Sequence, residues 1–421
     1  MNPFSRLDRN GGFAALLVFL VPMLLPFGRT AEAPIVIGVF IGALALPGRL
    51  RAMLAHPAVR AFTLATGAYF LAALFSTFDA VLAEKSWTTA LASVRLLLFG
   101  FGVIALCERA REHGVPARQL GQSLSIAAAV PIAIWTIDAL VQVASGHSIG
   151  GSLDADRLSG IFGADDLKLG PLLPALAPLL LWPLLQRSRA VLVVAYLLIL
   201  IVVLLAGSRA GWVSYALVSA LIVWRLARGS KRRLAIWGAA ALLMATIAGT
   251  AAYQLSPSFE ARVARTLGGS QADADFALAG RVPIWVTAVR MAGAHPINGV
   301  GVRGFRYAYP LHASPADRWV DTESQTGASH AHQLLLELLT ETGILGLLFW
   351  LVGSVALIRA MLLTSTEAFV RAPWVALGVL AFPFNTHLAF YSSFMGMVLG
   401  WLLALACAQS MLFPRETEDG R

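Results

Sequence analysis

Long apolar stretches recur along the whole chain, and they constrain its fold more than any other feature. A helix needs roughly 20 mostly apolar residues to cross a membrane. Only 13% of the residues are charged, too few to build the surface of an ordinary soluble enzyme or a disordered protein. The sequence therefore predicts an all-α polytopic membrane protein with about twelve transmembrane helices, at 12–28, 33–47, 61–78, 89–107, 121–145, 169–185, 190–207, 211–226, 234–254, 332–359, 371–388 and 391–412.

Lys and Arg in the connecting segments predict the orientation of these helices. With the N-terminus in the cytoplasm, 19 Lys and Arg fall in cytoplasmic segments and 5 in the short loops of the other side. Cytoplasmic loops of membrane proteins carry such an excess, so we expect both termini in the cytoplasm. One long loop, 255–331, then faces outward with seven Arg, which the rule does not explain because long translocated loops are exempt from it.

The long loop divides the chain into segments. We expect transmembrane helices 1–9 in residues 1–254, a loop domain in 255–331, helices 10–12 in 332–412 and a cytoplasmic tail in 413–421.

The loop domain is predicted to contain an amphipathic helix near 283–293. Its apolar face is expected from Trp285, Ala288, Val289 and Ala292, which recur at i, i+3, i+4 and i+7.

Two arginines are placed where they could bind an anion. Arg209 follows Gly207 and Ser208 in a very short hairpin between two predicted spans, so it is either an interface anchor or an anion site at the start of the next helix. Arg281 lies two residues before Pro283, at the start of the amphipathic helix. A phosphate there would meet a guanidinium and a helix N-terminus together; the alternative is a solvated loop charge.

His330 and His332 lie where the long loop re-enters the membrane. A histidine at this interface suits a general base because its pKa is near neutrality, although helix capping, packing or a metal site are alternatives. Glu337 and Glu341 follow one turn apart and would orient partners or form an ion pair with a loop arginine.

Other charged residues have two readings each. Arg157 and Lys168 flank an outer loop and would either receive an anionic headgroup or be neutralised by nearby aspartates. Arg95 and Asp138, inside predicted spans, would either pair with each other or belong to a substrate track.

Three stretches together resemble the O-antigen ligase and O-antigen polymerase superfamily of bacterial glycosyltransferases. They are Gly207-Ser208-Arg209; Gly280-Arg281-x-x-x-Trp285 with His295-Pro296-x-x-Gly299-x-Gly301-x-x-x-Phe305; and His332-Gln333-x-x-Leu336-x-x-Leu339-x-Glu341-x-Gly343-x-x-Gly346. Family members usually have His-Asn where this chain has His332-Gln333, a departure that concerns the details of the acceptor site.

The resemblance implies a membrane-embedded glycosyltransferase fold of the GT-C type with one large periplasmic loop. It implies a glycan donor on undecaprenyl pyrophosphate, a lipid A core acceptor and no nucleotide sugar. The family's two essential arginines fall on Arg209 and Arg281, and its essential histidine falls on His332.

We therefore expect an inverting O-antigen ligase of lipopolysaccharide biosynthesis in the bacterial inner membrane, with its active site facing the periplasm. It would need no cofactor or metal and would contact membrane lipids but no nucleic acid. Further substrate contacts are expected from Arg157, Lys168, His330, Gln333, Trp285 and Arg303. The alternatives are an O-antigen polymerase, a protein O-oligosaccharyltransferase with the same donor and, from another class, a lipid-linked glycan flippase.

Overall fold

The computed structural model describes residues 11–152, 157–164, 166–267, 278, 280–384 and 388–415. These residues are mainly helical, and the sheet among them is a two-stranded antiparallel ribbon of β1 (His147–Ser148) and β2 (Gly151–Ser152). The helices are α2 (Gly12–Leu24), η1 (Leu25–Ala31), α3 (Glu32–Ala55), α4 (Pro57–Phe75), α5 (Ala83–Glu112), α6 (Ala117–Ser145), η2 (Gly160–Phe162), α7 (Leu169–Leu176), α8 (Pro178–Leu184), α9 (Arg189–Leu205), α10 (Arg209–Ala227), α11 (Lys231–Leu255), α12 (Pro257–Leu267), α14 (Val282–Ala294), α15 (Phe305–His312), α16 (Leu334–Leu362), α17 (Ala368–Leu380) and α18 (Ser393–Leu412).

The helices confirm an all-α polytopic membrane protein. Within the described residues, eight helices are long and apolar enough to cross a membrane, with α2 and α3 counted as one because η1 joins them. The expected stretches at 169–185, 190–207 and 371–388 correspond to shorter apolar helices. Each of the twelve expected stretches overlaps a helix, whereas the number of membrane crossings stays a prediction.

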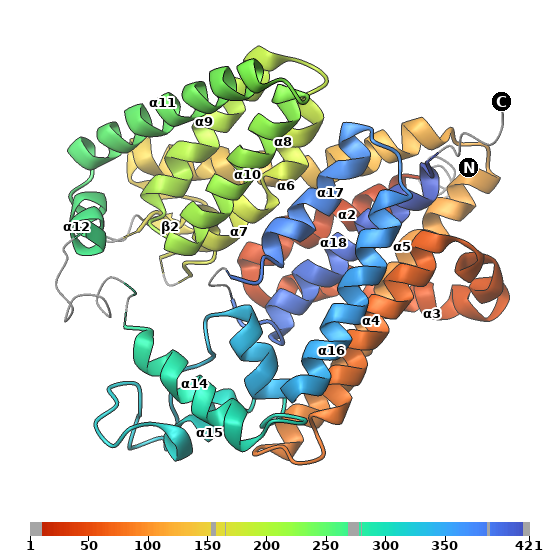
Figure 1. Cartoon of the computed structure of the whole chain (residues 1–421). Coiled ribbons are helices and arrows are strands. Elements are labelled where there is room, and N and C mark those ends of the chain that lie inside the picture. Colours follow the sequence, from red (N-terminus) through yellow and green to blue (C-terminus); the bar gives the residue numbers. More distant parts are fainter. Residues whose placement is uncertain are drawn as a thin grey trace.

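The helices form two groups that α17 and the contact between α2 and α6 connect. The first group contains α2 to α5, α16 and α18, and the second contains α6 to α11; α17 packs against α7 and α8 on one side and α18 on the other (Figure 1). The described ends of the chain lie at the top right of Figure 1, while α14 and α15 lie at the bottom. We call the bottom the loop-domain end and the top the basic end, after the Lys and Arg side chains of its α8–α9 and α10–α11 turns.

Close helix packing holds the first group together. The α3–α5 contact depends on glycine: a Cβ on Gly42 would lie 2.0 Å from the carbonyl oxygen of Leu98. Trp401 in α18 donates a hydrogen bond to the carbonyl oxygen of Val18 in α2 at 2.9 Å, which ties the last helix to the first. Small residues at such interfaces let helix backbones approach within a membrane.

The charged residues inside the spans do not pair with each other, so this expectation for Arg95 and Asp138 is wrong. Arg95 faces α3 and α18, where it lies 3.6 Å from Glu32 and donates to Ser393 at 2.6 Å. Asp138 lies on α6 and accepts a hydrogen bond from the backbone N–H of Ile149 at 2.9 Å. The two helices turn these side chains toward different neighbours.

The amphipathic helix exists as α14, but its buried face differs from the predicted one. The buried residues are Ile284, Thr287, Ala288 and Met291, while Val289 is 61% exposed. The face is rotated because Trp285 turns its indole N–H toward another loop and Thr287 packs inward.

Candidate functional site

The hairpin between α9 and α10 places Arg209 at the first residue of a helix. Gly207 has a φ of 60°, and Ser208 caps α10 by accepting a hydrogen bond from Gly211 N at 3.2 Å. Gly211 packs so closely on α7 that a Cβ there would lie 2.3 Å from the carbonyl oxygen of Gly170. Arg209 is half-buried on this rigid turn, beside the N–H groups that start a helix.

A second arginine, Arg262 of α12, covers the same hairpin. The rings of Trp212 and Phe259 lie 5.5 Å apart and hold α12 against α10. Arg262 is only 8% exposed, and a Cβ on Gly207 would lie 1.4 Å from its Nη1 atom. Sequence reasoning missed Arg262; the one available signal is Phe259 three residues earlier, which puts both side chains on one face of a helix.

Arg281 begins α14 and belongs to the same cluster of positive charge. The turn before it is fixed by Gly280, which has a φ of 74° and whose carbonyl oxygen accepts a hydrogen bond from Trp319 Nε1 at 2.7 Å. Burial lowers the pKa of Arg281, and the positive charges of Arg209 and Arg157 lower it further. The fold thus brings together Arg157, Arg209 and Arg281, which lie far apart in the sequence. We call these three and Arg262, which covers the hairpin of Arg209, the arginine site.

The histidine pair is held next to α14. Trp285, one turn after Arg281, donates from Nε1 to the carbonyl oxygen of Ala331 at 3.1 Å. The rings of His330 and His332 have centroids 3.7 Å apart, and His330 Nδ1 lies 2.9 Å from the hydroxyl of Ser329. Through Trp285, α14 therefore links the arginine site to the histidine pair.

His332 has a strained backbone. Its φ is 52°, in the left-handed region that residues other than glycine seldom adopt. Such strain costs on the order of 1–3 kcal/mol and tends to cluster at functional sites. The histidine predicted as a general base thus lies in a special conformation just before α16 begins.

Gln333 has a structural role in this loop. Its Oε1 caps α16 by accepting from Leu336 N at 2.6 Å, and its Nε2 donates to the carbonyl oxygen of Pro383 at 2.8 Å. The amide of Gln333 therefore fixes the start of α16 and joins it to the α17–α18 loop. A side-chain amide can form further hydrogen bonds beside these two, so a substrate contact by Gln333 stays a prediction.

The glycine motifs of the loop domain and of α16 meet each other. Gly343 interrupts α16 with a φ of 63°, and the carbonyl oxygens of Thr340 and Glu341 accept from Val300 N at 2.8 Å and Gly301 N at 3.1 Å. A Cβ on Gly299 would lie 2.5 Å from the backbone of Glu341. The loop therefore docks on the helix that follows His332, and side chains larger than glycine would separate them.

Arg303 approaches the two buried glutamates of α16. Its charge acts on both Glu337 and Glu341, and Glu341 also accepts hydrogen bonds from the backbone of Arg303 and Phe305. Glu337 accepts from Phe390 N at 2.5 Å. The acidic pair therefore positions the loop on α16, in keeping with one of the two roles that the sequence suggested for it.

Lys168 is neutralised locally. Its ammonium group forms an ion pair with Asp166 and lies 4.6 Å from the ring centre of Phe394. Of the two outer cations Arg157 and Lys168, Arg157 is the one whose charge acts on Arg281.

An apolar groove begins at Arg157. It has a volume of about 600 Å³ and is lined mainly by α6, α9 and α11. Arg157, Ser256 and Ser258 are the polar residues at its edge, and the rest is aliphatic. The groove therefore connects the arginine site with the apolar surface of the helices.

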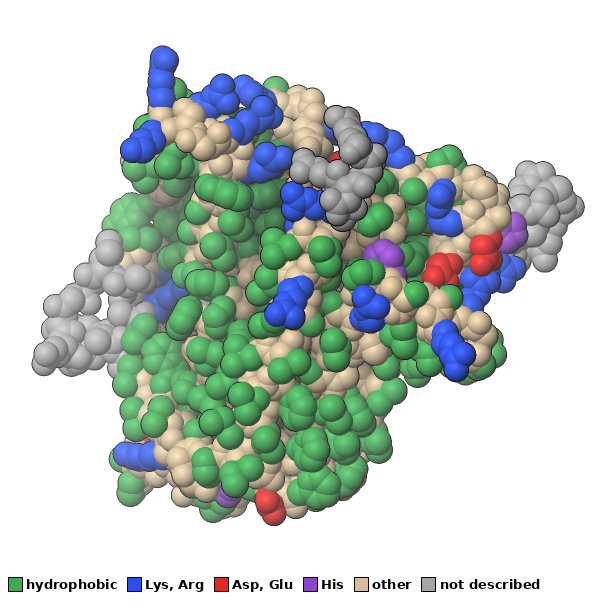
Figure 2. Space-filling view, turned by 45° about the vertical axis from the view of Figure 1, so that its right-hand side comes forward, with side chains coloured by type: hydrophobic (Ala, Val, Ile, Leu, Met, Phe, Trp, Pro, Cys, Tyr) green, Lys and Arg blue, Asp and Glu red, His purple; other side chains and the backbone are tan. Residues whose placement is uncertain are grey.

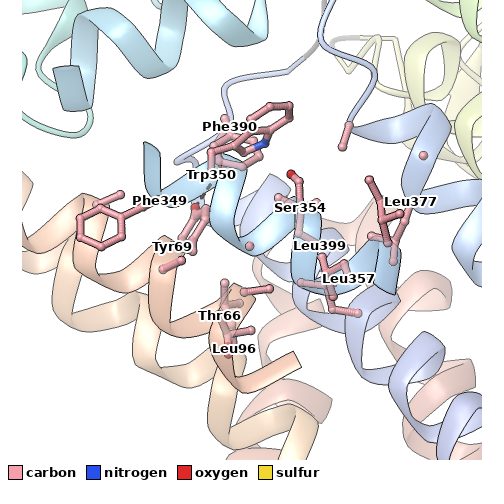
Figure 3. A pocket seen from close by; sticks show the side chains of 18 of the residues that line it. Thr66, Tyr69, Leu96, Phe349, Trp350, Ser354, Leu357, Leu377, Phe390 and Leu399 are labelled. Atoms are coloured by element: carbon pink, nitrogen blue, oxygen red, sulfur yellow. Dashed lines mark hydrogen bonds between the residues drawn. The ribbon is translucent and has the colours of Figure 1, made fainter. Parts of the chain in front are cut away.

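A second apolar cavity lies between α4, α16, α17 and α18 (Figure 3). Its volume is about 380 Å³, and its walls include Tyr69, Trp350, Leu357 and Phe390. Phe390 connects this cavity to the buried glutamates, because its ring lines the cavity while its backbone bonds to Glu337. The cavity thus lies along α16, the helix that follows His332, from Gly346 onward.

Metal binding has no support from clustered ligands. In the ranges that the structure describes, no three His, Cys, Asp or Glu side chains come together as a metal site requires. Metal independence stays a prediction.

The fold and this site define a class: a polytopic all-α membrane protein with a half-buried cationic site and a histidine at one end of its helices. Residues 194–351 match the family model described as O-antigen ligase, which confirms the resemblance over the segment from α9 to α16. This segment contains Arg209, Arg262, Arg281 and His332. No curated protein matches the chain significantly.

Proposed function

We propose that this protein is an O-antigen ligase that transfers a glycan from undecaprenyl pyrophosphate to the lipid A core. The observation that carries the proposal is the convergence of Arg157, Arg209 and Arg281, in which burial and like charges lower the pKa of Arg281. Guanidinium groups gathered at the starts of helices attract anions, and a pyrophosphate is such an anion.

The arginines would act on the leaving group. Transfer breaks the bond between the anomeric carbon and the pyrophosphate oxygen, so undecaprenyl pyrophosphate departs with one more negative charge. Guanidinium groups bind phosphate oxygens in pairs. Each preorganised donor of this kind is worth roughly 3–4 kcal/mol of transition-state stabilisation. The location of Arg209 and Arg281 at the starts of α10 and α14 supports this role.

His332 would act as the general base. It would take the proton from the attacking hydroxyl of the acceptor while that oxygen bonds to the anomeric carbon. General-base catalysis contributes about 10²–10⁴ in rate. A single displacement of this kind inverts the configuration of the anomeric carbon.

The two apolar cavities favour an acceptor that is also a lipid. The groove beside Arg157 suits the polyprenyl tail of the donor, because it starts at the arginine site and continues between α6, α9 and α11. The cavity lined by Tyr69 and Phe390 is separate from this groove and lies along α16, the helix that follows His332. A soluble protein acceptor would need no second apolar cavity, so this arrangement favours lipid A core over a protein acceptor.

The test uses the purified full chain in phospholipid vesicles with a labelled glycan on undecaprenyl pyrophosphate. Three acceptors are supplied separately: lipid A core, a lipid-linked single repeat and a secreted acceptor protein. We expect transfer to lipid A core. Transfer only to the repeat would identify a polymerase, transfer only to protein would identify an oligosaccharyltransferase, and either result would overturn the proposal.

The His332→Ala variant tests the mechanism in the same assay. We expect a loss of about 10²–10⁴ in rate, with glycan donor binding retained. The matched control is His312→Ala, since His312 lies in the loop domain with its ring 5.6 Å from that of His295, outside the histidine pair. Equal rates for the two variants would contradict a base role for His332.

A further inference from the structure

The basic end carries cations without any acid in the same part of the chain. Between Asp166 and Glu260 the sequence contains no Asp or Glu. Seven Lys and Arg cluster at the turns that join α8 to α9 and α10 to α11, namely Arg187, Arg189, Arg225, Arg228, Lys231, Arg232 and Arg233. Figure 2 shows Lys and Arg side chains gathered along the top of the molecule.

The cations on the neighbouring helices are balanced in a way that these are not. Arg49 on α3 lies 2.8 Å from Glu112 and 3.6 Å from Glu108 of α5. Arg118 at the start of α6 lies 3.9 Å from Glu367, just before α17. Glu367 does lie near the α8–α9 turn, since the neighbouring Ala368 donates from its backbone N–H to Gln186 at 3.2 Å. The location of these cations at the predicted cytoplasmic end does not explain why acids are interspersed among the cations of α3 and α5 and absent from the sequence between α8 and α11.

A tight turn concentrates the unbalanced cations. Arg228 and Gly229 both have left-handed backbones, with φ of 48° and 78°, and Ser230 caps α11 by accepting from Arg233 N at 3.4 Å. Lys231 and Arg232 follow directly, and both are exposed. The turn thus presents several cations to one small area of surface.

An apolar slot begins under the same cations. It lies between α9, α10 and α11, and its lining includes Leu192, Ile222 and Met244. Arg189 stands at its edge, with its guanidinium 5.8 Å from the ring centre of Trp237. Beside the slot, α11 exposes 70% of Leu242, a surface suited to lipid chains. The slot has a volume of only about 40 Å³, too small for an acyl chain, so an amphiphile would lay its chains on the exposed apolar side of α11 and its anionic head among the cations. A soluble anion would gain nothing from this apolar surface.

We propose that the basic end of α8–α11 binds an anionic phospholipid, with its phosphate among the cations of the two turns and its acyl chains along the exposed apolar side of α11. Basic clusters next to a membrane attract anionic lipids. This site is separate from the arginine site, since the two lie at opposite ends of α9, α10 and α11. The proposal does not depend on the glycan transfer reaction.

The test measures lipid retention by native mass spectrometry. The full chain is released from micelles that contain equal amounts of phosphatidylglycerol and phosphatidylcholine. We expect preferential retention of phosphatidylglycerol, reduced roughly tenfold or more in Lys231→Gln/Arg232→Gln/Arg233→Gln, because each basic residue adds to the attraction. The matched control Arg51→Gln/Arg60→Gln/Arg415→Gln removes three cations elsewhere and should retain phosphatidylglycerol like the unmodified chain.

A salt titration of the unmodified chain makes the test independent of any variant. Raising the salt concentration from about 0.05 M to about 0.5 M shortens the Debye screening length roughly threefold, which weakens the attraction between the cations and an anionic headgroup. Phosphatidylglycerol should therefore be released before phosphatidylcholine. Equal retention of both lipids at low salt, or equal losses in the two triple variants, would overturn the proposal.

Discussion

The two cationic ends of this protein differ in how their charges are held. At the loop-domain end, Arg262 is 8% exposed, and Arg209 and Arg281 are half-buried at helix starts fixed by glycine turns. At the basic end, Lys231 and Arg232 are exposed on the first turn of α11. The number of positive charges therefore does not distinguish a reaction site from a lipid-facing surface. The burial of the arginine side chains distinguishes the two ends.

This difference has an energetic reason. Exposed cations remain hydrated, so they cost little and interact with anions in a way that salt screens. Half-buried arginines are less hydrated, so salt screens their interaction with a bound anion much less. We expect the two ends to respond differently to the same changes, and the predictions below use that contrast.

The largest expected effect in this comparison is the loss of a site arginine. Arg209→Ala and Arg281→Ala should each lower the rate of glycan transfer by about 10²–10³, the usual effect of removing one donor to a developing negative charge. Arg232→Ala, which removes an equal charge from the basic end, should leave the rate within about twofold, because surface changes away from the site have small effects. Steady-state rates in vesicles give the comparison, and similar losses at both ends would refute it.

Glycine substitutions sharpen the comparison at the level of the backbone. Gly207→Ala and Gly229→Ala both place a side chain at a positive φ, 60° and 78°, and both should cost on the order of 1–3 kcal/mol of stability. Only the Cβ at position 207 meets a neighbour, the guanidinium of Arg262; at position 229 nothing lies within 4 Å.

We therefore expect Gly207→Ala to lower transfer by roughly tenfold or more beyond its effect on stability, since misplacing a catalytic group by about 1 Å costs up to 10²-fold. Thermal unfolding in detergent and transfer rates, measured on both variants, separate the two effects. If Gly229→Ala lowers transfer as much as Gly207→Ala, the position of Arg262 does not matter.

The smallest expected effect is that of metal removal. If the arginines supply the positive charge at the leaving group, then chelation with EDTA should change the transfer rate by less than about twofold, since the charge stabilisation then comes from protein donors. Activity lost on chelation and restored by Mg²⁺ or Mn²⁺ would show that a cation shares this role.

The sequence was most informative where the pattern is local. Apolar stretches predicted the helices, and the position of Pro283 predicted the start of α14. The three residues placed by motif, Arg209, Arg281 and His332, lie in one connected part of the structure, through the charge of Arg209 on Arg281 and the bond between Trp285 and Ala331.

The failures of sequence reasoning concern contacts between distant segments. Arg262 was missed because its relation to Gly207 exists only after α12 folds over the hairpin. Pairing of Arg95 with Asp138 was wrong because the side-chain directions depend on how the helices rotate in the bundle, which composition does not reveal. The buried face of α14 was misassigned for the same reason, since Trp285 turns toward Ala331.

The central claim is that the arginine site binds the pyrophosphate of the lipid donor, and binding of undecaprenyl pyrophosphate to the purified chain tests it most directly. The account predicts binding that weakens about tenfold or more in Arg209→Ala and Arg281→Ala, as expected when a charge-assisted hydrogen bond is lost. Arg290→Ala, which removes an exposed arginine on the same helix α14, should leave the affinity unchanged. Equal affinity in all three variants and the unmodified chain would contradict the account.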